Sequence, residues 1–341
     1  MRKSVLASVF AFVSLLPLSV ALAGYSSLIV FGDSLSDSGN NAIALAPNVT
    51  MVPPPISGNS FIPFFPYSSS GRYTNDKVWA QLVASSLGLS ADPSLAGGTN
   101  YAFGGAETGI TPATGPPSLV AQTGIFLSQH GPTIPGDALY VVEGGGQNAR
   151  DALAAIAGCA DQACVNGIIQ TTVTGFVGDI KTINSTLEAA GAKHIVDWDV
   201  PDIGKTPAAL AEGALASALG TTIASTMNQA LSATIGSDPD VKLFDIFGLM
   251  NAAIADPGAF ELSNVTDACA QFPACIADPS NFLFWDGIHP TSATEAIISD
   301  AIEALVVPEP STLVLLAVAL FGLGFIRFAG GTRIRALRNR F

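Results

Sequence analysis

The feature that most limits the fold of this sequence is a set of short apolar runs separated by much longer segments. The runs cover residues 27–31, 138–142, 194–198 and 241–244. Each is too short for a stable helix and is bounded by turn-forming residues, as expected of a buried strand. Ala, Thr, Ile and Leu recur at helical spacing over 163–190 and 207–235, and a further helix is predicted over 291–305. Strands joined by such helices predict a mostly parallel sheet covered on both faces, which is a three-layer α/β/α sandwich.

The N-terminal segment has the composition of a secretory signal. Arg2 and Lys3 precede an apolar run over 5–21, and Ala21-Leu22-Ala23 supplies the small residues that a signal peptidase reads. We therefore predict that residues 1–23 form a signal peptide cleaved after Ala23. A short transmembrane anchor is the alternative.

The C-terminal segment has three parts. Pro308-Glu309-Pro310 precedes an apolar stretch over 312–326, and five arginines follow it. The stretch is marginal for spanning a bilayer, which takes about 20 residues, and the arginines favour a cytoplasmic end. This layout resembles the PEP-CTERM sorting signal of Gram-negative bacteria. The resemblance implies that residues 308–341 are a tail processed by an exosortase-like enzyme, with at least transient membrane contact. It also implies export across the inner membrane to the cell surface or extracellular matrix; a plain single-span anchor is the alternative.

Charge is distributed unevenly between these ends and the rest of the chain. The full chain has a formal net charge of −13, but residues 24–307 alone hold 7 basic and 26 acidic residues, a net of −19. Such a surface repels phosphate backbones, so a nucleic-acid partner is excluded. The length of this part fits one large α/β domain over 24–307.

The four cysteines form two close pairs. Cys159 lies near Cys164, and Cys269 lies near Cys275. In an oxidising compartment this spacing predicts two local disulfides. A zinc site is the weaker alternative, because no Cys-x-x-Cys spacing occurs and no histidine lies near either pair.

Residues 46–72 differ from the rest of the domain. They contain six prolines and four phenylalanine or tyrosine residues, and proline disfavours both a regular helix and a central strand. We predict a long loop packed over the active-site side of the sheet, where specificity commonly resides. Its aromatic content hints at an apolar acyl site, although such residues also serve as packing.

A serine follows directly after the first apolar run. The sequence from Phe31 to Asn40 reads Phe-Gly-Asp-Ser-Leu-Ser-Asp-Ser-Gly-Asn, so a buried strand ends at Gly32-Asp33 and Ser34 opens the next turn. Such a turn exposes the hydroxyl at the carboxyl edge of the sheet, beside backbone amides able to hold an oxyanion. A helix cap is the alternative role for this serine.

An aspartate and a histidine lie three residues apart near the end of the domain. Asp286-Gly287-Ile288-His289 precedes the last predicted helix. One loop can then present His289 to Ser34 as general base, while Asp286 orients the imidazole. The other histidines, His130 and His194, lack neighbouring ligands at suitable spacing, so we expect no metal and no cofactor. The absence of a Gly-x-Ser-x-Gly motif argues against the α/β-hydrolase fold.

These motifs together resemble the GDSL/SGNH hydrolase family of lipases and esterases, whose fold is flavodoxin-like. Residues 31–41 resemble the family's first block and 286–290 its last, the Asp-x-x-His block. Residues 99–106 resemble the second block and 200–207 a further family segment, so the resemblance covers roughly 27–305. It implies that Ser34, Asp286 and His289 form a catalytic triad. It also assigns oxyanion-binding amides to Ser34 and Gly105, with Gly104 as the alternative glycine.

One block departs from the family pattern Gly-x-Asn-Asp. The segment over 144–151 reads Gly-Gly-Gly-Gln-Asn-Ala-Arg-Asp, which places Gln147 at the Asn position and Asn148 at the Asp position. The family's Asn donates the third oxyanion hydrogen bond, and Gln147 or Asn148 is expected to replace it. Loss of one such donor lowers the rate by about 10²–10³.

The sequence therefore predicts an exported serine ester hydrolase that forms an acyl-enzyme on Ser34 and acts on a lipid or an acylated glycan. Two alternatives remain. One is a non-catalytic or weakly active surface or matrix protein on the same fold. The other is an O-acyl esterase or acyltransferase acting on polysaccharide.

Overall fold

The computed structural model describes residues 24–46, 50–109 and 115–307, of which 25–305 form one compact unit. The predicted signal peptide (1–23) and sorting tail (308–341) lie outside these residues. Within the three described ranges, no helix combines the length and the apolar character needed to cross a membrane.

A four-stranded parallel sheet forms the centre of this unit. Its strands, in spatial order, are β1 (Leu28–Phe31), β2 (Leu139–Val142), β3 (Ile195–Trp198) and β4 (Val241–Phe244). Phe31 pairs with Val142 at the carboxyl ends of β1 and β2. The four predicted strands are thus confirmed. A separate parallel pair, β5 (Asn264–Ala268) and β6 (Phe282–Phe284), was not expected.

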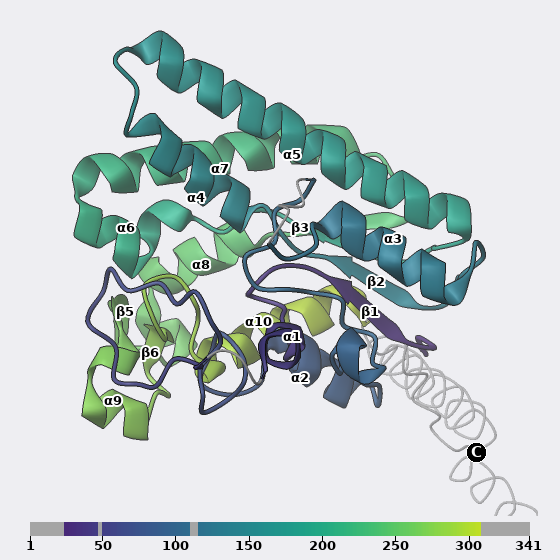
Figure 1. The fold of residues 1–341 in the computed structure, drawn as a ribbon, viewed down its shortest axis with the longest axis horizontal. Coiled ribbons are helices and arrows are strands. Elements are labelled where there is room, and N and C mark those ends of the chain that lie inside the picture. The colour runs from purple at the N-terminus through teal and green to yellow at the C-terminus, as the bar shows by residue number, and fades with distance from the viewer. Residues whose placement is uncertain (1–23, 47–49, 110–114, 308–341) are drawn as a thin grey trace, which may run out of the picture. The chain divides into compact units, whose positions relative to one another are not determined.

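Four helices cover one face of the sheet, at the top of Figure 1. They are α3 (Leu119–His130), α4 (Gly146–Ile156), α5 (Gln162–Ala190) and α7 (Ala214–Ile235). Alternate strand residues such as Phe31 and Tyr140 share one buried cluster with Phe126, Phe176 and Met227 of these helices. This cluster is the main core of the domain.

Helices α2 (Trp79–Ser86) and α10 (Ser292–Val306) lie on the opposite side of the sheet in Figure 1. The Trp79 ring contacts that of Trp198 on β3, with centroids 4.8 Å apart. The backbone N–H of Trp79 donates to Glu295 Oε2 of α10 at 2.9 Å. Both faces of the sheet are therefore covered, as the predicted three-layer α/β/α architecture requires.

The helical predictions are confirmed with one correction. Helix α5 begins after Asp161, whose side chain accepts the Cys164 N–H, and α10 matches the predicted 291–305. The helical stretch predicted near 207–235 is divided into two helices, because α6 (Pro207–Glu212) ends at Gly213 and α7 starts anew. Gly213 has φ +102°, which interrupts the helical hydrogen bonding.

The remaining helices connect these layers. They are α1 (Asn40–Leu45), α8 (Ile246–Ala255) and α9 (Pro273–Ala277), together with the 3₁₀ turns Ser94–Ala96, Ile203–Lys205, Pro257–Phe260 and Cys269–Gln271. Residues 50–72 contain no helix and only one isolated bridge, Val52 with Tyr67, so the predicted loop is confirmed for this stretch.

Both predicted disulfides are present. The Cα atoms of Cys159 and Cys164 lie 5.5 Å apart, and those of Cys269 and Cys275 lie 5.3 Å apart. The second bridge belongs to a small buried cluster that includes Tyr67 and Trp285. It therefore packs beside the loop that carries Asp286.

Candidate active site

The turn after β1 places Ser34 at the carboxyl edge of the sheet. The carbonyl of Asp33 accepts the N–H groups of Ser36 at 3.2 Å and Asp37 at 3.0 Å, which closes a tight turn around Ser34. The Asp33 side chain accepts the Leu35 N–H at 3.0 Å. The Ser34 hydroxyl is thus held at the point where parallel α/β sheets bind ligands.

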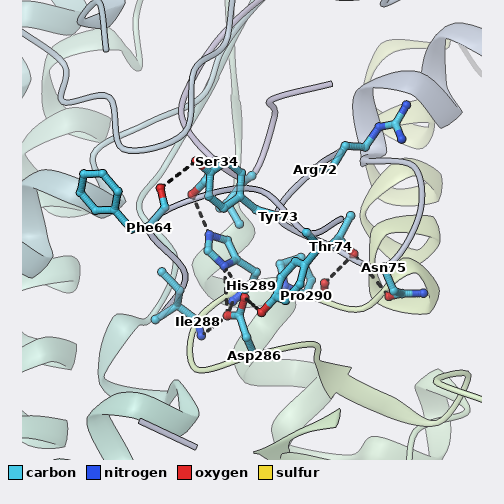
Figure 2. A network of polar contacts seen from close by, with 12 residues as sticks. Ser34, Phe64, Arg72, Tyr73, Thr74, Asn75, Asp286, Ile288, His289 and Pro290 are labelled. Carbon is cyan, nitrogen blue, oxygen red and sulfur yellow. Dashed lines mark hydrogen bonds and ion pairs between the residues drawn. The ribbon is translucent and has the colours of Figure 1, made fainter. Parts of the chain in front are cut away.

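Ser34, His289 and Asp286 form one hydrogen-bonded row (Figure 2). Ser34 Oγ lies 2.8 Å from His289 Nε2, and His289 Nδ1 lies 2.8 Å from Asp286 Oδ2. An Nδ1–H directed at the carboxylate leaves Nε2 unprotonated, so that it accepts the serine proton. The structure therefore brings together the three residues that the sequence singled out, although Ser34 lies 255 positions before His289.

Asp286 is fully buried and accepts hydrogen bonds from several donors besides the imidazole of His289. Its Oδ1 accepts the backbone N–H groups of Ile288 and His289, both at 2.9 Å. The buried Tyr67 hydroxyl donates to Oδ2 at 2.8 Å. Burial and the adjacent Asp286 carboxylate both raise the pKa of Tyr67, which keeps its hydroxyl a donor. The carboxylate is therefore fixed in the orientation that holds the imidazole.

The segment after Tyr67 supports the histidine. The Tyr73 ring lies against the imidazole of His289, with centroids 5.2 Å apart. Thr74 Oγ1 donates to the Pro290 carbonyl at 2.8 Å, and Figure 2 shows both contacts beside the row. Tyr67, Tyr73 and Thr74 were not identified from the sequence as site residues. The loop 46–72 and the residues just after it thus hold the triad in place.

The structure distinguishes between the two candidate oxyanion glycines. The Gly104 N–H donates to Asp37 Oδ2 at 3.1 Å, and a Cβ at Gly104 would lie 2.2 Å from the Tyr73 ring. Gly105 has φ +83° and lines the cavity beside Ser34. Because the Gly104 amide is already used, Gly105 is the better candidate of the two, and its role as oxyanion donor stays a prediction.

Gln147 and Asn148 lie in different environments at the start of α4. Gln147 lines the cavity, but its Nε2 donates to Asp151 Oδ1 at 2.9 Å and its Oε1 accepts from Arg150 at 3.2 Å. Asn148 Oδ1 accepts the Thr108 N–H at 3.1 Å, and this residue is not part of the cavity wall. Gln147 is thus the better placed of the two, with its amide turned toward Asp151.

A cavity opens beside Ser34 and His289, and its walls are mostly aliphatic. They come from α8, β6 and α10 and include Leu249, Met250, Ala253, Leu283, Phe284 and Ile297. Within the described part of this loop, residues 50–72, none lines this cavity, which agrees with packing as the role of its aromatic residues. Pro63 and its neighbours lie in the stretch that supports the triad, whereas α8, which was not predicted, supplies the apolar wall.

Two buried glutamates near Ser34 were also missed. Glu143 directly follows β2 and Glu295 lies in α10, and each is 1 % exposed. Burial raises the pKa of both carboxyl groups well above the usual range. A lone acid directly after the apolar run 138–142 was the available signal for Glu143.

Over the described residues, no three His, Cys, Asp or Glu side chains are placed to hold a metal ion. The expectation of no cofactor stays a prediction.

A parallel α/β sheet with a Ser–His–Asp row at its carboxyl edge is the arrangement of a serine-hydrolase-type domain. Residues 28–302 match the family model described as GDSL-like Lipase/Acylhydrolase. The chain therefore belongs to that family. Residues 306–327 match the PEP-CTERM protein-sorting motif, which indicates export and sorting to the cell envelope.

Several curated relatives carry esterase or lipase names. Esterase EstA of Pseudomonas aeruginosa is 28% identical over 317 residues, covering 81% of this chain and 46% of that protein. A GDSL esterase/lipase of Arabidopsis thaliana is 26% identical over 344 residues, covering 86% of this chain and 94% of that protein. Lipase 1 of Photorhabdus luminescens is 30% identical over 190 residues, covering 54% of this chain and 23% of that protein. The chain spans about half the length of the first bacterial relatives that it matches.

Proposed function

We propose that this protein is an exported serine ester hydrolase that forms an acyl-enzyme on Ser34. The observation that carries the proposal is the unbroken hydrogen-bonded row from Ser34 through His289 to Asp286, which opens directly onto an apolar cavity. Membership of a family of lipases and acylhydrolases supports the same reaction class.

The proposed reaction has two steps. His289 Nε2 takes the proton of Ser34 Oγ as the oxygen attacks the ester carbonyl carbon, and the charge moves onto the carbonyl oxygen. The amides of Ser34 and Gly105, with the Gln147 side chain, stabilise that oxyanion. His289 then gives its proton to the departing alcohol, the C–O bond breaks, and the acyl group stays on Ser34. Water attacks next, His289 removes its proton, and the acid leaves with Ser34 restored.

The cavity favours an ester whose acid portion is an apolar chain. Its aliphatic walls offer no matching donors to a sugar, but they remove a hydrocarbon chain from water, which is worth about 0.8 kcal/mol per buried CH₂. An acetyl group would leave most of the wall unused. We therefore assign a fatty acyl ester rather than an acetylated glycan as the substrate.

The sorting motif adds a location to the proposal. A match to PEP-CTERM over 306–327 supports processing by an exosortase-like enzyme after export, and delivery to the cell surface or matrix. The hydrolase would then act on esters outside the inner membrane. Both disulfides are consistent with an oxidising compartment.

A non-catalytic matrix protein on the same fold is the second candidate. The observation in its favour is that Gln147 is bonded to Asp151 and Arg150 instead of facing the oxyanion position.

Hydrolysis of p-nitrophenyl esters from acetate to palmitate, by the protein purified under oxidising conditions and by Ser34→Ala, separates the two candidates. The hydrolase should lose activity in Ser34→Ala, and a fluorophosphonate should label only the unmodified protein. A folded protein that neither hydrolyses any of these esters nor takes the label would refute the proposal.

A further inference from the structure

A buried carboxyl group lies directly beneath the turn that carries Ser34. Glu143 follows β2, and its backbone N–H donates to the Phe31 carbonyl at 2.9 Å, beside the end of β1. Its Oε2 accepts the Asp33 N–H at 3.1 Å and the Ser36 hydroxyl at 2.8 Å. These two residues flank Ser34 and Leu35. One side-chain oxygen therefore joins both ends of the nucleophile turn.

The surroundings leave this carboxyl group little freedom. A Cβ at Gly32 would lie 2.7 Å from Glu143 Oε2, so the turn packs directly on the acid. The Ser36 hydroxyl also accepts the indole N–H of Trp79 at 3.2 Å. Trp79 is in turn held by Glu295 of α10 through its backbone N–H. The hydrogen bonds thus continue from the turn through α2 to the helix on the far face.

The charges around Glu143 favour its neutral form. Asp33, which is 4 % exposed, is its nearest acidic neighbour, and burial together with this neighbour raises the pKa of Glu143. Burial also raises the pKa of Asp33, but the Leu35 N–H, the Arg150 charge and His289 in its protonated form oppose that rise. Two adjacent buried acids do not readily ionise together, and the pKa of Glu143 is raised well above its usual range, so Glu143 is the member of the pair that favours the protonated form.

We propose that Glu143 is a positioning residue that, in its protonated form, fixes the Ser34 turn and leaves Asp33 as the only ionised member of this pair of acids. The inference rests on the proposed function. When His289 takes the serine proton and becomes a cation, the negative charge of Asp33 stabilises it alongside Asp286. A second ionised carboxylate would repel Asp33 within a buried pocket and displace the turn.

Two variants separate the hydrogen bonding of Glu143 from its shape. Glu143→Gln keeps an acceptor for Asp33 and Ser36 and supplies an N–H donor to the Asp33 carboxylate. Glu143→Leu fills similar space and offers neither. We expect Glu143→Gln to retain kcat within about threefold at pH 7, and Glu143→Leu to lower kcat by about 10- to 100-fold with KM nearly unchanged. Glu143→Leu with the wild-type kcat, or Glu143→Gln as impaired as Glu143→Leu, would overturn the inference.

The pH profile provides a readout that a purely structural role would not move. In the wild-type protein kcat should fall at alkaline pH as Glu143 ionises, whereas Glu143→Gln should lack this fall. The same alkaline fall in both proteins would overturn the inference. This comparison stays decisive even if Glu143→Leu does not fold.

Urea unfolding tests the shared proton without any ester substrate. The folded state keeps the Glu143 proton above about pH 4.3, where an unfolded glutamate releases it. The wild-type protein should therefore lose free energy of unfolding relative to Glu143→Gln as pH rises above that value. Parallel curves would refute the inference. If the wild-type protein hydrolyses no ester, the proposed function fails, while this divergence still reports on the Glu143–Asp33 pair.

Discussion

Replacing Gln147 by alanine should lower kcat by about 30- to 150-fold and leave KM for a soluble p-nitrophenyl ester nearly unchanged. The residue lies at the second position of α4 and lines the cavity together with Ser34 and Gly105. Its amide now bonds to Asp151, so the prediction requires that it turn toward the oxyanion when substrate binds.

Two energies decide whether the Gln147 side chain rotates toward the oxyanion, and they differ in size. The bond from Gln147 to Asp151 is exposed, and breaking it costs at most about 1 kcal/mol. A third oxyanion donor is worth about 2.7–4 kcal/mol in the transition state. The difference leaves about 2–3 kcal/mol, and each 1.36 kcal/mol changes the rate about tenfold. The cost of breaking the bond to Asp151 therefore reduces the benefit of the Gln147 donor without removing it.

Asn148→Ala is the matched control. Its Oδ1 accepts the Thr108 N–H away from the cavity wall, so the variant should lose about 1 kcal/mol of stability, measured by urea unfolding, and keep its kcat. Asp151→Ala releases the Gln147 amide and should raise kcat by up to about fivefold. A normal kcat in Gln147→Ala together with a large loss in Asn148→Ala would reverse the assignment.

Three further changes test other parts of the site. Tyr67→Phe removes one hydrogen bond to Asp286 and should lower kcat by about 10- to 100-fold while the fold, followed by circular dichroism, is retained. Replacing Cys269 and Cys275 by serine should cost about 2 kcal/mol in thermal unfolding and also lower kcat, because this bridge packs beside Tyr67 and Trp285. Replacing Cys159 and Cys164 by serine should cost a similar free energy of unfolding and leave kcat unaltered. If the two double variants lowered kcat equally, the reasoning would be contradicted. Ala253→Phe fills the apolar cavity and should lower kcat/KM for palmitate esters at least tenfold more than for acetate esters. Equal losses on both esters would mean that the acyl chain lies elsewhere.

Most of the sheet could be predicted because β1, β2 and β3 are buried on both faces. Runs such as Ile195–Trp198 are then apolar or aromatic at most positions, and their chain order matches their order in space. The break between α6 and α7 could not be predicted in the same way. Gly213 lies in a stretch of good helix formers, and the break is supported by a distant contact, the Ala208 N–H donating to the Gly287 carbonyl at 2.9 Å.

The triad was accessible to sequence reasoning because Asp286 and His289 share one loop, and a serine after a buried strand has few other roles. Tyr67 was not accessible, since it reaches Asp286 across 219 positions and nothing in a proline-rich loop distinguishes one aromatic residue from another. The wall of the cavity was missed for a related reason. Helix α8 is short and apolar at nearly every position, so its periodicity does not reveal which side faces a ligand.

The nucleophile and the side-chain oxyanion donor, Gln147, come from different segments, and this separation matters for the departure at 144–151. Ser34, His289 and Asp286 are held by β1, by the loop before α10 and by Tyr67, none of which depends on α4. A weakened donor at Gln147 therefore slows the stabilisation of the oxyanion without disturbing the activation of Ser34. Such a protein would still react with a fluorophosphonate, whose phosphorus is strongly electrophilic, and yet turn over esters slowly. Labelling without rapid turnover would thus indicate an impaired hydrolase. A binding protein that only retains the fold would not need the hydrogen bonds that join Ser34, His289 and Asp286.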